Sequence, residues 1–250
     1  MKKLIAFDLD GTLAESKSPL PDRMAELLNS LLEKKEVCVI SGGKFEQFEK
    51  QLLDNLKADS DNLKHLHIMP TCGTRYYRYD SSSNKWNKLY AENFTAAEKK
   101  KIIAALQESI ADCGFDKEET WGEQVEDRES QITFSALGQQ APVDAKEAWD
   151  PSGDKKLKIR NRVAELIPDF EVRTGGATSI DVTKLGIDKA YGMRKLIELT
   201  GIKKEEILFM GDRLKEGGND YPVKAMGIDS IEVSHWQDTA LVIQAIVLSS

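Results

Sequence analysis

The chain has 250 residues, of which 40% are hydrophobic and 31% are charged, and its formal net charge is −7. This profile excludes a disordered chain and fits one large domain or two smaller ones, each with its own core. The acidic balance argues against a nucleic-acid partner, which would require a basic face.

The N-terminus, MKKLIAFDLDG, starts with two lysines and an apolar run that breaks at Asp8 after four residues. That run is too short for the apolar region of a signal peptide or for a membrane span. The three cysteines are widely spaced and lack a C-x-x-C pair, which fits reduced thiols. We therefore expect a cytoplasmic protein with no membrane partner.

The first quarter of the chain alternates between buried strands and amphipathic helices. Short apolar runs predict strands at Lys3–Phe7 and Glu36–Ile40. Helical spacing of apolar residues predicts a helix over Asp22–Lys34 and another that begins near Phe45 and reaches Leu56. This order is typical of a parallel sheet with helices on both faces.

The pattern changes after about Tyr79, where hairpins replace single strands. Ser81–Asn84 predicts a turn between two aromatic-rich strands, and Thr95 and Glu98 are spaced as a capping box for a helix to Ala111. The other predicted elements are a hairpin of Gln124–Asp127 with Gln131–Ser135, a helix at Lys155–Leu166, and strands at Glu171–Arg173 and Ser179–Val182. Such a mixture favours an inserted α+β unit with an antiparallel sheet.

From Asp188 onward the strand and helix alternation resumes, with a helix at Lys189–Leu199, a strand at Ile207–Met210, a strand at Ser230–Val233 and a final helix. We therefore predict one α/β core domain made from residues 1–81 and 187–250. Residues 82–186 are expected to form a cap inserted into it.

Polar residues that can do chemistry follow the predicted parallel strands of the core, at the edge where open α/β sheets bind ligands. These residues are Asp8, Asp10, Ser41, Lys189, Asp212 and Asp220. Singly, each has a simpler explanation: a D-G turn, a helix cap at Ser41, a solvated lysine at Lys189. As an ordered set they favour a catalytic site.

These same residues resemble the motifs of the haloacid dehalogenase superfamily. FDLDGT at Phe7–Thr12 resembles the first motif, Ser41 the second, Lys189 the third, and GDRLKEGGND at Gly211–Asp220 the acidic fourth. The position of the cap resembles subfamily IIB, which contains sugar phosphatases and eukaryotic-type phosphomannomutases. VEDRESQITFSALG and TGGATSIDVTKLGIDK are most similar to the phosphomannomutase pattern. The resemblance implies a Rossmann-like core with an inserted cap.

Chemical roles follow for the core residues. Asp8 would attack phosphorus and form an aspartyl-phosphate, while Asp10 would act as general acid and then as general base. Mg²⁺ would be held by the carboxylates of Asp8, Asp212 and Asp220, and by resemblance also by the main-chain carbonyl of Asp10. Ser41 and Lys189 would neutralise the phosphoryl oxygens. The neighbouring loop residues Thr12, Gly42, Gly218 and Asn219 complete the expected core site, with Gly42 beside the substrate.

The cap is expected to select the substrate by closing over the bound phosphate. By resemblance, Arg128 matches an arginine that grips a second phosphate, and Ser179 and Asp181 match positions that contact the sugar. Trp121 and Gln139 stand where phosphomannomutases have further arginines, and Gln139 can bind hydroxyls without adding charge.

Three functions remain open at this point. Because a mutase needs strong contacts to its distal phosphate, hydrolysis of a sugar phosphate is favoured over phosphomannomutase activity. A catalytically silent binding module is the third alternative. The resemblance also implies a homodimer through the cap.

Two further patterns have simpler interpretations. His65 and His67 alternate along a predicted strand but have no third metal ligand nearby, so we expect them at the surface. The aromatic run of Tyr76, Tyr77 and Tyr79 predicts packing.

Overall fold

The computed structural model describes residues 2–117 and 119–249, and the chain divides into two compact units. The core unit contains Met1–Ala91 and Asp188–Ser250, and the cap unit contains Glu92–Ile187. The first boundary lies after Ala91 rather than at residue 82. The reason is that strand β5 (Lys85–Ala91) pairs along its length with β4 (Arg75–Asp80), and so extends the core sheet.

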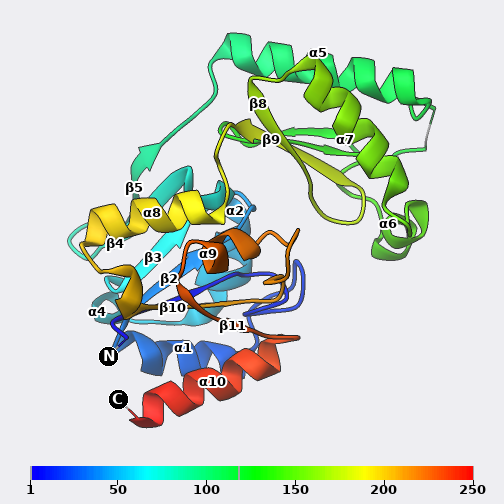
Figure 1. The fold of residues 1–250 in the computed structure, drawn as a ribbon. Helices are drawn as coiled ribbons and strands as arrows, with labels where there is room; N and C mark the ends of the chain where they lie inside the picture. The colour runs from blue at the N-terminus through cyan, green and yellow to red at the C-terminus, as the bar shows by residue number, and fades with distance from the viewer. Residues whose placement is uncertain (1, 118, 250) are drawn as a thin grey trace. The chain divides into compact units, whose positions relative to one another are not determined.

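The core unit contains a seven-stranded sheet with the order β11-β10-β1-β2-β3-β4-β5 (Figure 1). β1 pairs in parallel with both β2 and β10, so the earliest strand lies between an early and a late one. β4 pairs antiparallel with both β3 and β5, and the other pairings between the described strands of this sheet are parallel. The remaining strands are β1 (Leu4–Phe7), β2 (Glu36–Ile40), β3 (Leu66–Met69), β10 (Ile207–Gly211) and β11 (Asp229–Glu232).

Helices cover both faces of the core sheet. Helices α1 (Asp22–Leu32) and α10 (Trp236–Ser249) lie against one face, and α8 (Lys189–Thr200) and α9 (Tyr221–Ala225) lie against the other (Figure 1). After β2 the chain forms a helical segment from α2 (Phe45–Phe48) through a π-helical turn (Glu49–Leu53) to α3 (Asp54–Leu56), followed by α4 (Ser60–Leu63). Single 3₁₀ turns occur at Thr71–Gly73 and Lys204–Glu206.

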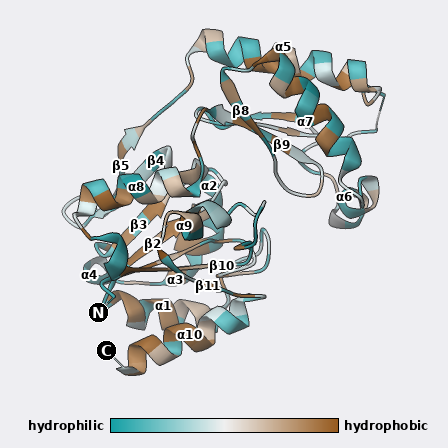
Figure 2. Cartoon of the chain, viewed as in Figure 1, coloured by the Kyte–Doolittle hydropathy of each residue, from teal (hydrophilic) through white to brown (hydrophobic). Residues whose placement is uncertain are grey.

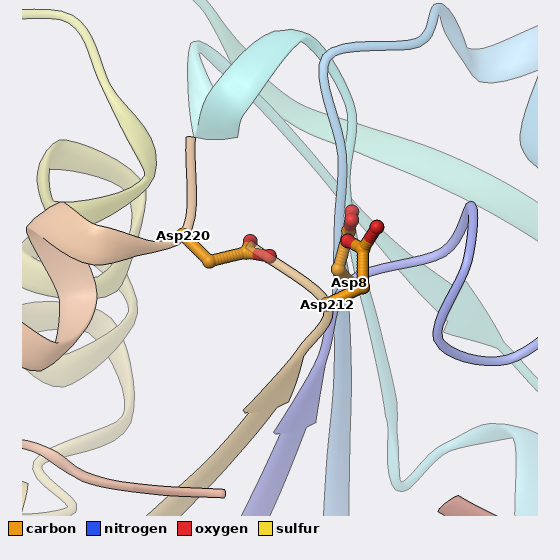
Figure 3. A group of neighbouring side chains, drawn as sticks. All are labelled: Asp8, Asp212 and Asp220. Atoms are coloured by element: carbon orange, nitrogen blue, oxygen red, sulfur yellow. The ribbon is translucent and has the colours of Figure 1, made fainter. Parts of the chain in front are cut away.

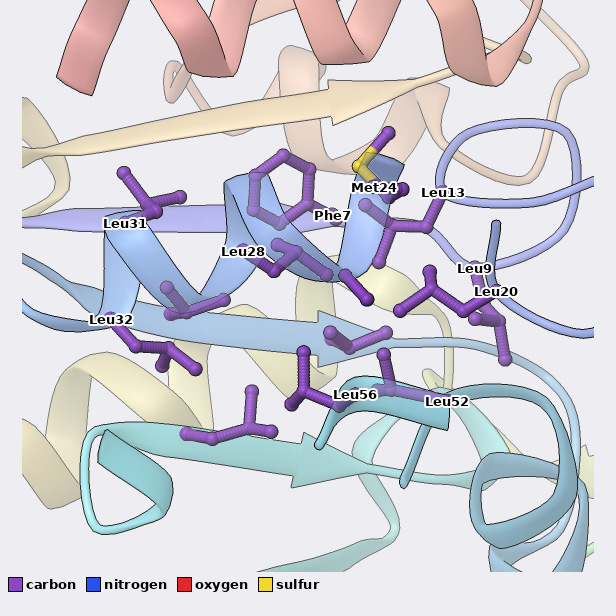
Figure 4. Close-up of a cluster of buried hydrophobic side chains, with 14 of the residues drawn as sticks. Phe7, Leu9, Leu13, Leu20, Met24, Leu28, Leu31, Leu32, Leu52 and Leu56 are labelled. Atoms are coloured by element: carbon purple, nitrogen blue, oxygen red, sulfur yellow. The ribbon is translucent and has the colours of Figure 1, made fainter. Parts of the chain in front are cut away.

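The alternation of side chains along β1 divides the core between the two faces of the sheet. Ile5 and Phe7 belong to the cluster beneath α1 and α10, whereas Leu4 and Ala6 belong to the cluster beneath α8 and α9. Figure 4 shows Phe7 packed against Leu28 and other apolar side chains of α1. Burying each large side chain of this kind stabilises the fold by about 1.5–3 kcal/mol, so both faces contribute to holding β1 in place.

The cap unit is an α+β layer with a four-stranded antiparallel sheet of order β6-β7-β9-β8. One face of this sheet is apolar and packs against the helices through Ile132, Phe134, Ile180 and Val182. Figure 2 shows hydrophilic and hydrophobic segments alternating along α5 and α7, as amphipathic helices require. The elements are α5 (Ala96–Cys113), β6 (Val125–Asp127), β7 (Ile132–Ser135), α6 (Val143–Trp149), α7 (Asp154–Leu166), β8 (Phe170–Thr174) and β9 (Ser179–Lys184).

The fold class predicted from the sequence is confirmed: an α/β unit and an α+β unit with an antiparallel sheet. The capping box is present, since the hydroxyl of Thr95 accepts from the backbone N–H of Glu98 and the Glu98 carboxylate accepts from the backbone N–H of Thr95. None of the described helices has the length and apolar character needed to cross a lipid bilayer.

The surface position expected for His67 is wrong, because the residue is only 2% exposed. Its Nε2 atom lies 2.8 Å from Oε2 of Glu36, and its Nδ1 atom lies 2.7 Å from the hydroxyl of Tyr76. His65 is partly exposed, and its Nδ1 atom lies 2.8 Å from the other Glu36 oxygen. The alternation along β3 turns His67 inward, where these polar partners compensate its burial. The predicted packing of Tyr76 and Tyr77 is confirmed, since both are buried.

Candidate active site

Asp8 lies at the carboxyl end of β1, in the first position beyond the strand. Its backbone N–H donates to the carbonyl of Met210 (3.0 Å), which continues the pairing of β1 with β10 by one residue. The residue is 4% exposed. The strand pairing therefore fixes this carboxylate at the edge of the sheet where ligands bind in parallel α/β folds.

Lys189 begins α8 and is 1% exposed. Its Nζ atom lies 2.7 Å from Oδ1 of Asp8 and 2.5 Å from Oδ1 of Asp220. The side chain of Asp188 caps the same helix by accepting from the backbone N–H of Tyr191 (2.7 Å), which fixes where α8 starts. One buried ammonium thus bridges two buried carboxyl groups.

The pKa values of these groups reflect their burial and crowding. Burial raises the pKa of Asp8 to about 7, although the Lys189 ammonium opposes this and Asp220 adds to it. Burial lowers the pKa of Lys189, but Asp8 and Asp220 outweigh it, so the net shift is upward. The pKa of Asp212 is also raised, first by burial and then by Asp220. The cluster therefore has more carboxyl groups than its one cation can neutralise, and their full ionisation is disfavoured.

Three carboxylates converge at this point and could hold a metal ion. Asp8, Asp212 and Asp220 each place one oxygen within 4.8 Å of the others, and Figure 3 shows Asp220 pointing toward the other two. Hard divalent cations such as Mg²⁺ prefer oxygen ligands of this kind. The excess of carboxyl groups and the all-oxygen donor set fit such an ion.

Glycines make room for two of these carboxylates. A Cβ atom at Gly11 would lie 2.7 Å from Oδ2 of Asp212, and Gly11 has φ = +80°, a conformation that other residues rarely adopt. A Cβ atom at Gly211 would lie 2.4 Å from Oδ2 of Asp220. That oxygen accepts from the backbone N–H of Arg213 (3.0 Å). The loops around the carboxylates therefore need small residues where the backbone approaches them.

The carboxylate of Asp10 forms hydrogen bonds with residues outside the three-carboxylate cluster. Its Oδ1 atom accepts from the backbone N–H of Lys17 (2.7 Å) and from Nε2 of Gln51 (3.1 Å), and its Oδ2 atom accepts from Nε2 of Gln47 (2.9 Å). The expectation that Asp10 is a metal ligand concerned its main-chain carbonyl and stays a prediction. Neither glutamine was predicted from the sequence, although their spacing of four residues on a predicted helix is a usable signal.

The remaining core residues lie in the loops that follow the strands. Ser41 follows β2 and is 5% exposed, and its hydroxyl accepts from the backbone N–H of Gly43 (3.4 Å). Thr12 is fully buried, and among the described residues its hydroxyl finds no hydrogen-bond partner. Gly42 and Gly218 are partly exposed and Asn219 is exposed. Their proposed roles stay predictions.

The predicted cap residues lie on the polar face of the cap sheet or beside it. Arg128 donates from Nε to Oε2 of Glu126 (2.9 Å), and its Nη2 atom lies 2.8 Å from the same oxygen. Asp181 accepts from the hydroxyl of Thr133 (2.7 Å), its partner across β7 and β9. Burial raises the pKa of Asp181, while the Arg128 guanidinium lowers it. Arg128 and Asp181 are thus brought together within the cap unit.

Ser179 and Gln139 lie elsewhere in the cap unit. Ser179 begins β9 opposite Ser135 and is partly exposed. Gln139 follows β7, and its Nε2 atom donates to the carbonyl of Gln124 (3.2 Å). Trp121 is 38% exposed. Their contacts with a substrate stay predictions.

One family and several known proteins match most of the chain. The family described as haloacid dehalogenase-like hydrolase matches residues 5–222. A phosphomannomutase from Encephalitozoon cuniculi is 28% identical over 247 residues, which cover 95% of this chain and 91% of that protein. Phosphomannomutase 2 from Dictyostelium discoideum is 27% identical over 226 residues, covering 87% and 84% respectively.

Solved structures share the fold at lower sequence identity. The IMP-bound IMP-nucleotidase of Plasmodium falciparum, truncated at its N-terminus, aligns with a TM-score of 0.73 at 17% identity, over 100% of this chain and 68% of that one. A haloacid dehalogenase-like hydrolase from Bacteroides thetaiotaomicron aligns with a TM-score of 0.61 at 18% identity, over 98% and 100%. At these identities the likeness concerns the fold alone.

Proposed function

This chain belongs to the haloacid dehalogenase-like hydrolase family, and we propose that it is an enzyme that transfers phosphoryl groups through an aspartyl-phosphate on Asp8. The observation that carries this proposal is the buried arrangement of Asp8, Lys189 and Asp220, with Nζ of Lys189 within 2.7 Å of both carboxylates. A carboxylate held by one cation at the ligand-binding edge of a parallel sheet suits nucleophilic attack on phosphorus.

Asp8 attacks phosphorus in the first step and is released by water in the second. In the first step the Asp8–phosphorus bond forms, the bond to the leaving oxygen breaks, and Asp10 gives its proton to that oxygen. In the second step water attacks phosphorus, the Asp8–phosphorus bond breaks, and Asp10 takes a proton from the water. Lys189 and Ser41 donate hydrogen bonds to phosphoryl oxygens, which carry the developing charge.

We propose that Asp8, Asp212 and Asp220 hold Mg²⁺. When bound, Mg²⁺ supplies positive charge that offsets the repulsion between a carboxylate and a phosphate ester. The support is that the three carboxylates converge and outnumber the single lysine between them.

We propose a sugar phosphate as the substrate and hydrolysis as the reaction. The cap unit supports hydrolysis because Glu126 already binds the guanidinium of Arg128, which reduces the positive charge available for a second phosphate. Trp121 and Gln139 add none. A mutase must hold a bisphosphorylated intermediate, and so it needs more cationic contacts than these.

Phosphomannomutase activity is the second candidate, favoured by the relatives that match most of the chain. The deciding experiment incubates the protein and Mg²⁺ with mannose-1-phosphate, with and without a hexose bisphosphate. Hydrolysis predicts release of phosphate that does not depend on the bisphosphate. Bisphosphate-dependent formation of mannose-6-phosphate with little free phosphate would instead establish the mutase.

The same assay on Asp8→Asn tests whether the chain is a silent binding module. An enzyme loses its activity in this variant, whereas a binding module has no activity in either protein. We also propose that the chain works in the cytoplasm and pairs through its cap. Size determination by light scattering, with and without the cap substitution Trp121→Glu, tests the pairing.

A further inference from the structure

The carboxylate of Asp10 is held by two glutamine side chains from the helical segment that follows β2. Nε2 of Gln47 donates to Oδ2 of Asp10 and also to Oε1 of Gln51 (2.5 Å). Nε2 of Gln51 donates to Oδ1 of Asp10 and also to the carbonyl of Ser18 (3.0 Å). The four N–H groups of the two amides therefore all have acceptors, so neither side chain can rotate without losing two hydrogen bonds.

Gln51 also fixes the loop that carries Asp10. It is 4% exposed, and its backbone carbonyl accepts from the N–H of Leu20 (2.8 Å). Within the same loop, Lys17 has φ = +57°, a conformation uncommon outside glycine, and its backbone N–H donates to Asp10. The segment from Asp10 to Leu20 is thus attached to Gln51 at three points, of which Asp10 is one.

Gln51 lies within the π-helical turn of Glu49–Leu53. Such turns are rare and occur frequently at functional sites. Gly43 leaves space for the other amide, since a Cβ atom there would lie 2.2 Å from Oε1 of Gln47. A π-helical turn at Gln51 and a glycine beside Gln47 therefore accompany the two side chains that bind Asp10.

From this geometry we propose that Gln47 and Gln51 are positioning residues for proton transfer by Asp10. An amide is suited to this task because it is neutral and has both a donor and an acceptor. Its N–H groups hold and orient the carboxyl group of Asp10 through hydrogen bonds, without adding a charge beside it.

This proposal rests on the proposed function, and the test separates the two. The rate of phosphoenzyme formation is measured in single-turnover, Mg²⁺-containing reactions of the wild type, Gln51→Met and Gln47→Met. Two esters are compared: a sugar phosphate, whose alkoxide needs a proton on leaving, and 2,4-dinitrophenyl phosphate, whose phenolate does not. Gln237→Met, at an exposed position of α10, is the matched control.

Displacement of Asp10 should slow the reaction of the sugar phosphate by about tenfold to a hundredfold, part of the usual contribution of general acid catalysis. The reaction of the dinitrophenyl ester should slow by less than about threefold. An equal loss with both esters, or no loss with the sugar phosphate, would overturn the positioning role. The melting temperature of each variant checks its folding, and the less buried Gln47→Met provides the answer if Gln51→Met does not fold.

A different result would show that the proposed function itself is wrong. If the wild type forms no phosphoenzyme with either ester, then both the aspartyl-phosphate and the role of the glutamines are refuted before any variant is compared.

Discussion

Nζ of Lys189 lies 2.7 Å from Oδ1 of Asp8, and both side chains are almost completely buried. The residue that begins α8 is thus paired with the residue that follows β1. Because solvent does not screen this pair, removing either partner leaves the other charge in a poorly polarisable environment. The pair therefore links the stability of the core unit to its chemistry, and each partner can be tested separately.

Lys189→Met should lower both activity and stability. Loss of the cation leaves Asp8 and Asp220 facing each other, at a cost of about 3–5 kcal/mol in the free energy of unfolding at neutral pH. The rate should fall by at least about a hundredfold. Urea unfolding and steady-state kinetics measure the two effects. Lys195→Met, on the same helix but partly exposed, is the control, and equal stability of the two variants would contradict the prediction.

Asp8→Asn should change how stability depends on pH. The pKa of Asp8 is raised from 3.8 to about 7, so the native state binds this proton more tightly than the unfolded state does. The resulting stabilisation is fully present below pH 3.8 and is lost as the pH rises through about 7, at up to about 1.4 kcal/mol per unit. In EDTA, urea unfolding between pH 4 and pH 7.5 should show a decline in the wild type that the variant lacks. Parallel curves would refute this.

Mg²⁺ should stabilise the wild type against heat, and Asp212→Asn should reduce the effect. A ligand at a hundred times its dissociation constant adds about 2.7 kcal/mol to the stability of the state that binds it. Replacing one of three carboxylates weakens the site without unfolding the chain, because Asp212 is partly exposed. Thermal unfolding with Mg²⁺ and with EDTA measures the shift. The exposed Asp61→Asn serves as the control; a shift in Asp212→Asn equal to that of the control would exclude Asp212 as a ligand.

Glu36→Gln should affect stability but not catalysis. Burial raises the pKa of Glu36, but hydrogen bonds from His67 and His65 outweigh it and lower the pKa to about 2. Its stabilising contribution is therefore present above pH 4.5 and is lost as the pH falls through about 2. Because the group is partly exposed, we expect a loss of only about 1 kcal/mol at pH 7 and less at pH 3. Urea unfolding at both pH values tests this, while kcat should stay within about twofold. A large loss of activity would contradict it.

The gathering of Asp8, Lys189 and Asp220 was predictable because parallel strands place their carboxyl ends at one edge of a sheet. The burial of His67 was not. Alternation along β3 shows that His67 and Leu66 face opposite ways, but it does not show that Glu36 and Tyr76 lie beside the imidazole. The position of β5 was missed for a related reason: only the pairing with β4 shows which sheet it extends.

The contacts of Gln51 lay beyond the reach of the sequence for another reason. Apolar residues at Phe45, Phe48, Leu52 and Leu56 predicted a regular helix, and a π-helical turn leaves no distinct mark in such a pattern. A π-helical turn contains more residues than an α-helical turn, so its side chains point in directions that a regular helix would not predict. The hydrogen bond from Nε2 of Gln51 to Asp10 shows that this side chain faces Asp10 rather than solvent.

The insertion of β1 between β2 and β10 has a consequence for synthesis on the ribosome. When the N-terminal strands leave the exit tunnel, β1 still has one open edge, and the whole cap must be translated before β10 can cover it. Domains fold as units during synthesis, so the cap is free to fold while the core waits. For most of that interval the nascent chain carries the carboxyl group of Asp8 without Lys189, which pairs with it in the finished protein.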